Sequence, residues 1–252
     1  MEKLSVVIIC FNEEKNIGRC IDSVKEIADE ILILDSYSTD RTQAIAESKG
    51  AVVKQEPFRG FIEKKNKAVE LASNDFVLSL DADEALDPVL RNSIARAKNN
   101  MPRLAYKMNR CTSYCGKFIR HGSWYPDTKI RLFDRRTAQW GGTNPHDKVI
   151  LQPHIPVEHL NGDILHYSYE SISGHSVQND KLSTLAAESL YAKGRRTGIF
   201  NILVRPPWAF FQSYLVRAGF LDGFFGFVIA VQISHMTFLK HVKLYMLQKS
   251  AK

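Results

Sequence analysis

The chain has 252 residues, of which 44% are hydrophobic, 24% charged and 10% aromatic. Such a composition is typical of a globular protein, and it excludes a disordered chain, a collagen-like fibre and a multi-span membrane protein. Thirty-four Lys and Arg against 27 Asp and Glu give a net charge of +7, which favours an anionic partner such as a phosphate, a nucleic acid or an acidic membrane surface.

The first hundred residues alternate between short apolar runs and amphipathic stretches. A continuous apolar, β-branched run at 4–9 predicts a strand buried on both faces, and ILIL at 31–34 predicts a second short buried strand. AVVKQ at 51–55 and FVLSL at 76–80 predict a third and a fourth strand. Helices are expected between them, at 14–26, 40–49 and 62–71, with Asp40 as an N-cap and Gly50 just after a helix end. Strands that alternate with helices predict an α/β fold, with a mostly parallel central sheet covered by helices on both faces.

The last quarter of the chain differs from the rest in composition. Residues 200–247 hold 11 of the 26 aromatic side chains, so we predict a division of the chain into residues 1–195 and 196–252. Between Asp222 and Lys240 lie 17 residues without charge, fewer than the roughly 20 that a spanning helix needs. We expect 196–252 to form amphipathic helices in a membrane interface, with Lys240, Lys243 and Lys249 near anionic headgroups. A spanning helix, a tail folded onto the rest of the chain and a dimer contact are the alternatives.

The four cysteines and the first residues bear on the compartment. None of the cysteines forms a CxxC pair, and four are too few for a disulfide framework. The apolar run at the N-terminus is shorter than a signal peptide requires. We therefore expect a cytoplasmic protein.

Polar side chains follow three of the four predicted strands. Phe11, Asn12 and Glu13 come after the first strand, Asp35 after the second, and the pair Asp81 and Asp83 after the fourth. Because the carboxyl ends of parallel strands meet at one edge of the sheet, a ligand site is expected there. Two neighbouring carboxylates favour a cation between them, and their oxygens suit Mg²⁺ or Mn²⁺. The structural alternative is an acidic turn before a helix that Asp87 caps.

Two common phosphate-binding motifs are absent. There is no GxGxxG after the first strand and no GxxxxGK[ST], which argues against a dinucleotide oxidoreductase and a P-loop NTPase. A phosphate would then depend on the metal and on side chains such as Lys64, Lys65 and Lys67.

Four motifs in register carry a resemblance to a known family. SVVIICFNEEKNIGRCIDSV, LDSYSTDRT, KKNKA and LSLDADE resemble the family 2 glycosyltransferases of the GT-A fold over residues 4–90. The later segments WYPDTKIRLF, NPHDKV and LHYSYESI resemble the branch that contains lipopolysaccharide-core β-glucosyltransferases. The resemblance implies a metal-dependent, inverting enzyme that moves a sugar from a nucleoside-diphosphate sugar, with residues 1–100 as the nucleotide-sugar half and 101–195 as the acceptor half.

The resemblance also implies residue roles. Phe11 would pack on the nucleotide base, Asn12 belongs to the same segment, and Glu13 and Asp35 would bind ribose and base. Lys65 matches a basic residue near the base or diphosphate. Asp81 would lie by the ribose and the metal, and Asp83 would ligate the metal directly. The implied donor is a UDP-sugar, and the implied acceptor is a lipid-linked glycan at the inner face of the cytoplasmic membrane.

Transfer with inversion also needs a carboxylate base for the acceptor hydroxyl. Asp127, Asp134, Asp147, Glu158 and Asp163 are the candidates. Asp147 is favoured, because it follows the turn-rich segment QWGGTNPH. The resembling branch more often has His-Glu at this place, so the His146-Asp147 pair is one methylene shorter. Arg131 and His146 are candidates for phosphate or acceptor contacts, and Trp124 for stacking on a sugar or for the core.

Other functions compete with this interpretation. A phosphatase of the haloacid-dehalogenase kind also has two aspartates separated by one residue (a DxD motif) after a strand. In such a phosphatase the motif follows the first strand, whereas Asp81 and Asp83 follow the fourth predicted strand of this chain. A non-catalytic membrane-docking module with a structural metal is a second alternative. Nucleic-acid binding is not expected, because no recognised motif accompanies the positive charge.

Overall fold

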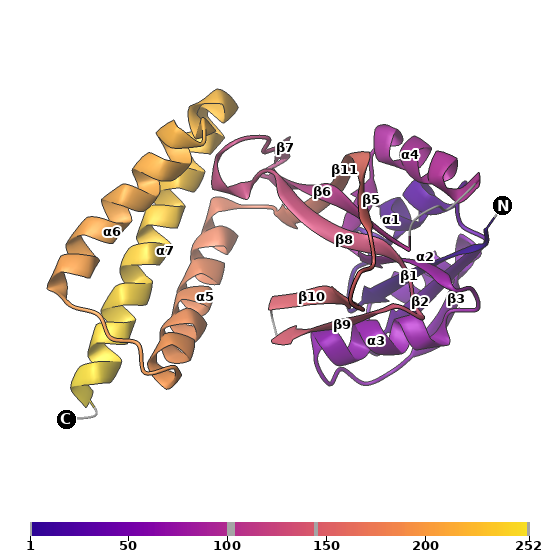
Figure 1. The fold of residues 1–252 in the computed structure, drawn as a ribbon, viewed down its shortest axis with the longest axis horizontal. Coiled ribbons are helices and arrows are strands. Elements are labelled where there is room, and N and C mark those ends of the chain that lie inside the picture. The colour runs from indigo at the N-terminus through magenta and orange to yellow at the C-terminus, as the bar shows by residue number, and fades with distance from the viewer. Residues whose placement is uncertain (1, 100–103, 144–145, 251–252) are drawn as a thin grey trace. The chain divides into compact units, whose positions relative to one another are not determined.

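A computed structural model describes residues 2–99, 104–143 and 146–250. The chain divides into two compact units (Figure 1): residues 1–110 with 127–167, and residues 111–126 with 168–252. The division that we predicted near residue 195 falls inside the second unit, between α5 (Ile172–Ala192) and α6 (Ile199–Phe211).

The parallel half of the first unit matches the prediction. Four strands run parallel in the order β3-β2-β1-β4: β1 (Leu4–Cys10), β2 (Glu30–Asp35), β3 (Val52–Gln55) and β4 (Phe76–Asp81). The register pairs Cys10 with Asp35 and Ile9 with Asp81. The polar residues that follow β1, β2 and β4 therefore lie at one edge of the sheet.

Helices cover both faces of this sheet, as predicted. The described helices of the first unit are α1 (Ile17–Val24), α2 (Thr42–Ser48), α3 (Phe61–Leu71) and α4 (Pro88–Asn99). Alternate residues of β1 enter two separate cores, because successive side chains of a strand point to opposite faces. Val6 and Ile8 pack with α1, α2 and α4, and Val7 and Ile9 pack with α3. Burying each such side chain stabilises the fold by roughly 1.5–3 kcal/mol.

One of the two predicted ends of α2 is found. The N-cap position is held by Arg41 rather than by Asp40, although the Asp40 carboxylate accepts hydrogen bonds from the backbone N–H and the hydroxyl of Thr42, the first residue of α2. Gly50 follows this helix with φ +83°, a conformation that favours glycine. The side chain of Asp87 accepts from the N–H of Leu90 at the start of α4, so Asp87 is a helix cap, as the structural alternative for this segment proposed.

Antiparallel strands extend the sheet beyond β4. They follow in the order β8-β6-β11-β5: β8 (Asp127–Asp134), β6 (Ala105–Tyr114), β11 (Val157–Tyr169) and β5 (Glu84–Leu86); β7 (Lys117–Phe118) pairs with β6. A separate hairpin joins β9 (Ala138–Thr143) to β10 (His146–Leu151). Gly162 has φ +102°, and a Cβ there would lie 2.2 Å from the backbone nitrogen of Leu90, so glycine lets β11 pass the start of α4.

The second unit is helical. α7 (Gly223–Ser250) packs against both α5 and α6. The ammonium of Lys243 lies 2.6 Å from the carboxylate of Asp180 on α5, so this lysine binds within the unit rather than reaching outward as we expected. By length and composition alone, the helical stretch Gly219–Ser250 could cross a membrane.

An aromatic cluster joins the two segments of the second unit. Trp124 stacks on Tyr169 with 5.1 Å between ring centroids, and both contact Tyr114 and His175. Phe225 of α7 contacts Tyr114 edge-on. Residues 111–126 are thereby packed onto the helices.

Candidate active site

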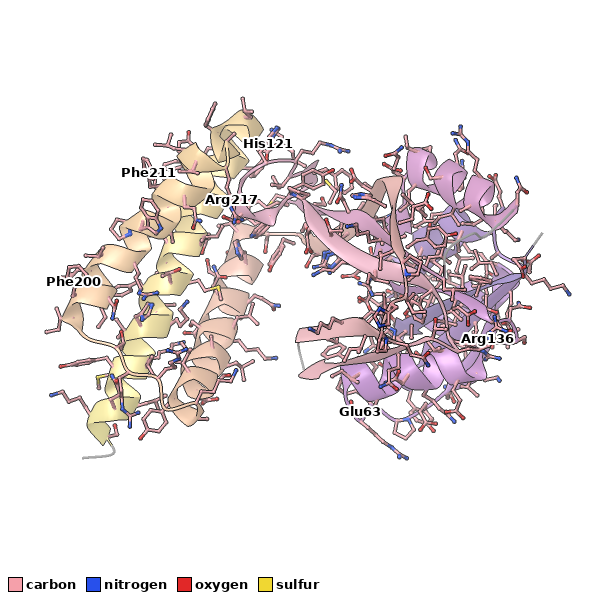
Figure 2. The ribbon with its side chains drawn as sticks, viewed as in Figure 1. Glu63, His121, Arg136, Phe200, Phe211 and Arg217 are labelled. Carbon is pink, nitrogen blue, oxygen red and sulfur yellow. The ribbon has the colours of Figure 1, made fainter. Side chains whose placement is uncertain are left out.

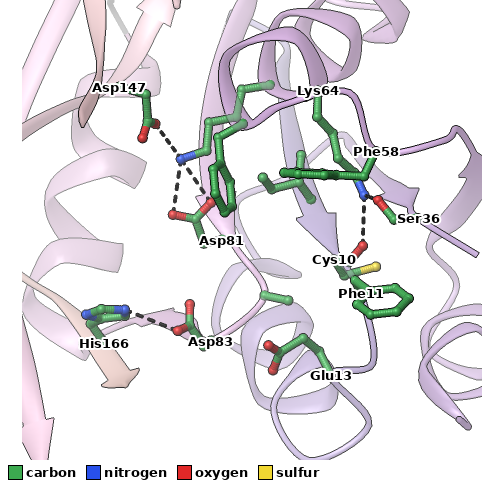
Figure 3. A pocket seen from close by; sticks show the side chains of 14 residues that line it. Cys10, Phe11, Glu13, Ser36, Phe58, Lys64, Asp81, Asp83, Asp147 and His166 are labelled. Atoms are coloured by element: carbon green, nitrogen blue, oxygen red, sulfur yellow. Dashed lines mark hydrogen bonds and ion pairs between the residues drawn. The ribbon is translucent and has the colours of Figure 1, made fainter. Parts of the chain in front are cut away.

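A cavity of about 340 Å³ lies at the carboxyl ends of β1 and β4 (Figure 3), and we call it the strand-end cavity. Four carboxylates and two ammonium groups line it: Glu13, Asp81, Asp83, Asp147, Lys64 and Lys65. His166, Ser36 and three phenylalanines complete much of the wall. The predicted Asp81, Asp83 and Asp147 are thus brought together from β4, the turn after it and β10.

Lys65 connects two of these carboxylates. Its ammonium lies 3.1 Å from Asp81 and 2.8 Å from Asp147, and the side chain is 4% exposed. The Arg131 guanidinium contacts the other oxygen of Asp81 at 3.2 Å. Burial alone would raise the pKa of Asp81, but Lys65 and Arg131 outweigh it and hold the pKa of this carboxyl well below its usual range. Asp81 therefore stays ionised at neutral pH.

Asp83 has a different partner. Its carboxylate lies 3.1 Å from Nε2 of His166 on β11 (Figure 3). A carboxylate oxygen and an imidazole nitrogen this close together would both be within reach of one Mg²⁺ or Mn²⁺, which takes oxygen ligands and accepts imidazole nitrogen. The Asp83–His166 pair therefore fits a shared divalent ion.

Such an ion would need further ligands. Within the described residues, no group of three or more His, Cys, Asp or Glu side chains is arranged to hold a metal. Mg²⁺ and Mn²⁺ commonly take the remaining ligands from water and substrate phosphates. Both oxygens of Asp81 have cationic partners, so Asp83 is the better placed of the two predicted metal ligands.

Arg131 is buried and also contacts Glu84 at 2.8 Å. Glu84 in turn accepts a hydrogen bond from the backbone N–H of Asp81. Arg131 and Glu84 thus hold the start of the DxD turn in place from β8 and β5.

Aromatic side chains stand at the rim of the cavity. Phe11 is 56% exposed and Phe58 is 55% exposed, and Phe61 packs edge-on against Phe58. Exposed rings beside a cavity are suited to stacking on a planar base. Glu13 lies near them; burial raises its pKa above the usual value, the hydrogen bond from Asn16 opposes the shift, and Asp83 adds to it.

Asp35 and Asn12 hold loops rather than line the cavity. Asp35 is fully buried, and it accepts hydrogen bonds from the backbone N–H and the hydroxyl of Ser38. Asn12 accepts from the N–H of Thr39 at 2.8 Å. The two side chains fix the loop after β2 against the loop after β1, and their predicted contacts with base and ribose stay predictions.

Lys64 has its own partners. Its ammonium donates to the carbonyl of Cys10 and to the hydroxyl of Ser36, and burial lowers its pKa. It therefore ties α3 to the ends of β1 and β2.

Of the five candidates for the base, Asp147 lines the strand-end cavity and the other four do not. Asp127 is bound by Arg110 at 2.8 Å, and the buried Asp134 is bound by Arg136 at 2.6 Å. Asp163 is buried, and Glu158 is exposed on β11.

Neither Trp124 nor His146, which we predicted as acceptor or phosphate contacts, is placed in the cavity by its described atoms. Trp124 belongs to the second unit and packs in its aromatic cluster. The side chain of His146 lies outside what the structure describes, although its backbone pairs with Thr143.

The sequence reasoning missed several lining residues. His166 lies in the segment LHYSYESI, and no local pattern singles it out, because β11 holds several other polar residues. Phe58 and Phe61 flank Gly60, and no local pattern marked them as part of a cavity.

Comparisons with known proteins agree with one another. Residues 5–151 match the model of glycosyl transferase family 2. An uncharacterized glycosyltransferase of Rickettsia typhi is 34% identical over 97% of this chain and 87% of its own length. The lipopolysaccharide core biosynthesis glycosyltransferase LpsC of Rhizobium meliloti is 28% identical over 96% of this chain and 92% of its own length.

Similar solved structures include glucosyl-3-phosphoglycerate synthase from Mycobacterium tuberculosis in complex with Mn²⁺, uridine diphosphate and glucosyl-3-phosphoglycerate. It is 26% identical and covers 44% of each chain, with a TM-score of 0.38.

Proposed function

Because the chain belongs to glycosyl transferase family 2 and is a glycosyltransferase, we propose that it moves a hexose from a UDP-sugar to a lipid-linked glycan such as a lipopolysaccharide core. The proposed reaction uses Mg²⁺ or Mn²⁺ and inverts the anomeric carbon. The fold supports the proposal, since the GT-A arrangement expected of the family is the one observed.

The observation that carries the proposal is the acidic strand-end cavity. Asp83 and His166 lie 3.1 Å apart in its wall, and they are the residues that would hold the ion. When bound, the ion would neutralise the charge that develops on the departing diphosphate. Phe11 and Phe58 would stack on the base at the cavity rim, and Glu13 would accept hydrogen bonds from the ribose.

Asp147 is the proposed base. As the acceptor oxygen forms its bond to the anomeric carbon, the hydroxyl proton passes to the Asp147 carboxylate, and the bond from the anomeric carbon to the diphosphate oxygen breaks. Lys65, 2.8 Å from Asp147, would fix the direction of this carboxylate.

The second unit suits work at a membrane, where a lipid-linked acceptor is embedded. Phe200 and Phe211 of α6 are exposed (Figure 2). Further exposed apolar side chains of this unit are Leu203, Trp208, Leu215, Phe220, Leu221 and Phe224. An exposed apolar area of this extent is typical of a docking surface.

The positive charge of the C-terminal residues supports a lipid surface as the partner of this apolar surface. Between residues 189 and 252 the sequence has nine Lys and Arg and a single acidic residue, Asp222. Asp222 is buried, and its carboxylate accepts from the backbone N–H groups of Arg120 and His121. We infer that the α6 side of this unit lies in the headgroup region of an anionic membrane, at its cytoplasmic face.

A two-stage experiment tests the proposal. UDP with Mn²⁺ should raise the melting temperature, whereas either alone should not. A panel of nucleotide sugars should then show turnover of one donor, read as release of the nucleoside diphosphate. Absence of both effects, or release of phosphate from a generic aryl phosphate, would overturn the assignment.

A further inference from the structure

A second cavity, of about 540 Å³, shares Lys65, Asp81 and Asp147 with the strand-end cavity. Its other walls come from Arg110 in the middle of β6, from β8 and from the β9–β10 hairpin. We call it the hairpin cavity. The proposed base therefore lies on a wall common to two spaces.

The two cavities differ in charge. The strand-end cavity is acidic, with four carboxylates to two ammonium groups. The described lining of the hairpin cavity has two carboxylates, Asp81 and Asp147, against five cations: Lys65, Arg110, Lys129, Arg131 and Lys148. An acidic cavity attracts a metal ion, whereas a basic one attracts an anion.

Part of this positive charge is not neutralised by the protein. Lys148 is exposed. Arg110 and Lys129 both contact Asp127, at 2.8 and 2.9 Å, so this one carboxylate lies between two cations. Glu84 likewise contacts both Arg110 and Arg131.

Two buried side chains of the same wall have unpaired donors. Nε and Nη1 of Arg131 and Nε1 of Trp140 are buried without a hydrogen-bond partner among the described residues. Arg131 is 3% exposed and Trp140 is 4% exposed. An unpaired buried donor is costly, so these N–H groups are an independent sign that the cavity receives an acceptor of hydrogen bonds.

We propose that the hairpin cavity binds an oxyanion, a phosphate or a carboxylate, on the acceptor sugar. The proposal rests on the proposed function, because it places the acceptor hydroxyl at Asp147 and the anionic group against Lys129, Lys148 and Arg131. A neutral acceptor would leave the excess positive charge of the described lining uncompensated and the buried donors without an acceptor. The cavity therefore selects anionic acceptors over neutral ones.

Calorimetry on the full chain tests the proposal. With UDP and Mn²⁺ saturating, glucose 6-phosphate, glucuronate and glucose are titrated as matched phosphate, carboxylate and neutral probes. At least one anionic sugar should bind about tenfold or more tightly than glucose, as charge-assisted hydrogen bonds imply. The tighter of the two anionic probes identifies the oxyanion.

Substitutions in the hairpin cavity test whether the preference for anionic sugars arises there. Lys129→Gln with Lys148→Gln should remove most of the anionic advantage and leave binding of UDP with Mn²⁺ unchanged. Lys54→Gln, an exposed lysine on β3 outside both cavities, is the matched control and should keep the advantage.

Two results would overturn the inference: equal affinity for the three sugars, or an anionic preference that survives the double substitution. Failure of the wild-type chain to bind UDP with Mn²⁺ would count against the proposed function instead. In that case the same titrations without nucleotide still decide whether the cavity prefers anionic sugars.

Discussion

The ammonium of Lys65 lies 2.8 Å from the carboxylate of Asp147 and 3.1 Å from that of Asp81, although Asp81 and Asp147 come from strands of two different sheets. The same ammonium lies 4.5 Å from the centre of the Trp140 ring. One buried cation thus joins the proposed base to the first residue of the DxD segment.

Replacing Lys65 should change the pH dependence of the enzyme. Lys65→Met removes one of the two cations that lower the pKa of Asp81, so that pKa should rise. The acidic limb of the kcat/KM profile should move to higher pH, and activity should fall at least about tenfold. Lys65→Arg should restore part of the activity. An unchanged profile in Lys65→Met would show that the bridge has no part in turnover.

Loss of the Asp83–His166 pair should abolish metal-dependent nucleotide binding. Asp83→Ala should eliminate the calorimetric signal for UDP with Mn²⁺, and His166→Gln should weaken binding by roughly 10–100-fold. His159→Gln, an exposed histidine on the same strand, should bind as the wild type does. Normal binding by Asp83→Ala would place the ion elsewhere.

Substitution of the proposed base should separate binding from chemistry. Asp147→Asn should bind UDP with Mn²⁺ normally and lower kcat by a factor on the order of 10²–10⁴. Glu158→Gln, another of the candidate carboxylates, serves as the control and should keep kcat. If Asp147→Asn retains most of its kcat, Asp147 is not the base.

The second unit should lose stability in mild acid through His175. Burial lowers the pKa of His175 to about 4, against about 6.5 in an unfolded chain. The contribution of the neutral His175 to the free energy of unfolding is fully present above pH 6.5. It falls by up to about 3 kcal/mol as the pH is lowered towards 4. Urea unfolding of wild type and His175→Gln at about pH 7 and pH 4.5 measures the difference. A parallel pH dependence of the two proteins would contradict the prediction.

Membrane binding should depend on α6. Replacing Phe200, Leu203 and Trp208 together with serine should lower the partition coefficient onto phosphatidylglycerol vesicles, measured by sedimentation, by a factor on the order of 10³ or more, since each buried side chain contributes roughly 1.5–3 kcal/mol. Val177→Ser on α5 is the control, because Val177 is as exposed as Phe200, at 73%. Equal sedimentation of all three proteins would exclude α6 as the docking surface.

The parallel half of the fold could be predicted because β1, β2 and β4 are mostly apolar, buried runs and the first helix has a marked apolar stripe. Ile17, Cys20, Ile21 and Val24, which form the stripe of the first predicted helix, are all buried in α1. The antiparallel half gave weaker signals, because β8 and β11 mix buried and exposed residues along their length.

The candidate site could be predicted only in part. Residues at the ends of β1 and β4 were found, since one topological rule places them together. Contacts such as Lys65 with Asp147, separated by 82 residues, and Asp83 with His166 depend on how the antiparallel strands fold back. Spacing along the chain carries no information about such pairs.

The helical unit is built from two separate stretches of chain, and this affects any attempt to shorten the protein. Residues 111–126 belong to that unit and pack on α5 and α7 through Tyr114 and Trp124. A stop codon placed after residue 167 would delete α5, α6 and α7, and the rings of Tyr114 and Trp124 would then be exposed to solvent. We therefore expect a truncated enzyme made for crystallisation to aggregate unless the apolar side chains of residues 111–126 are also replaced.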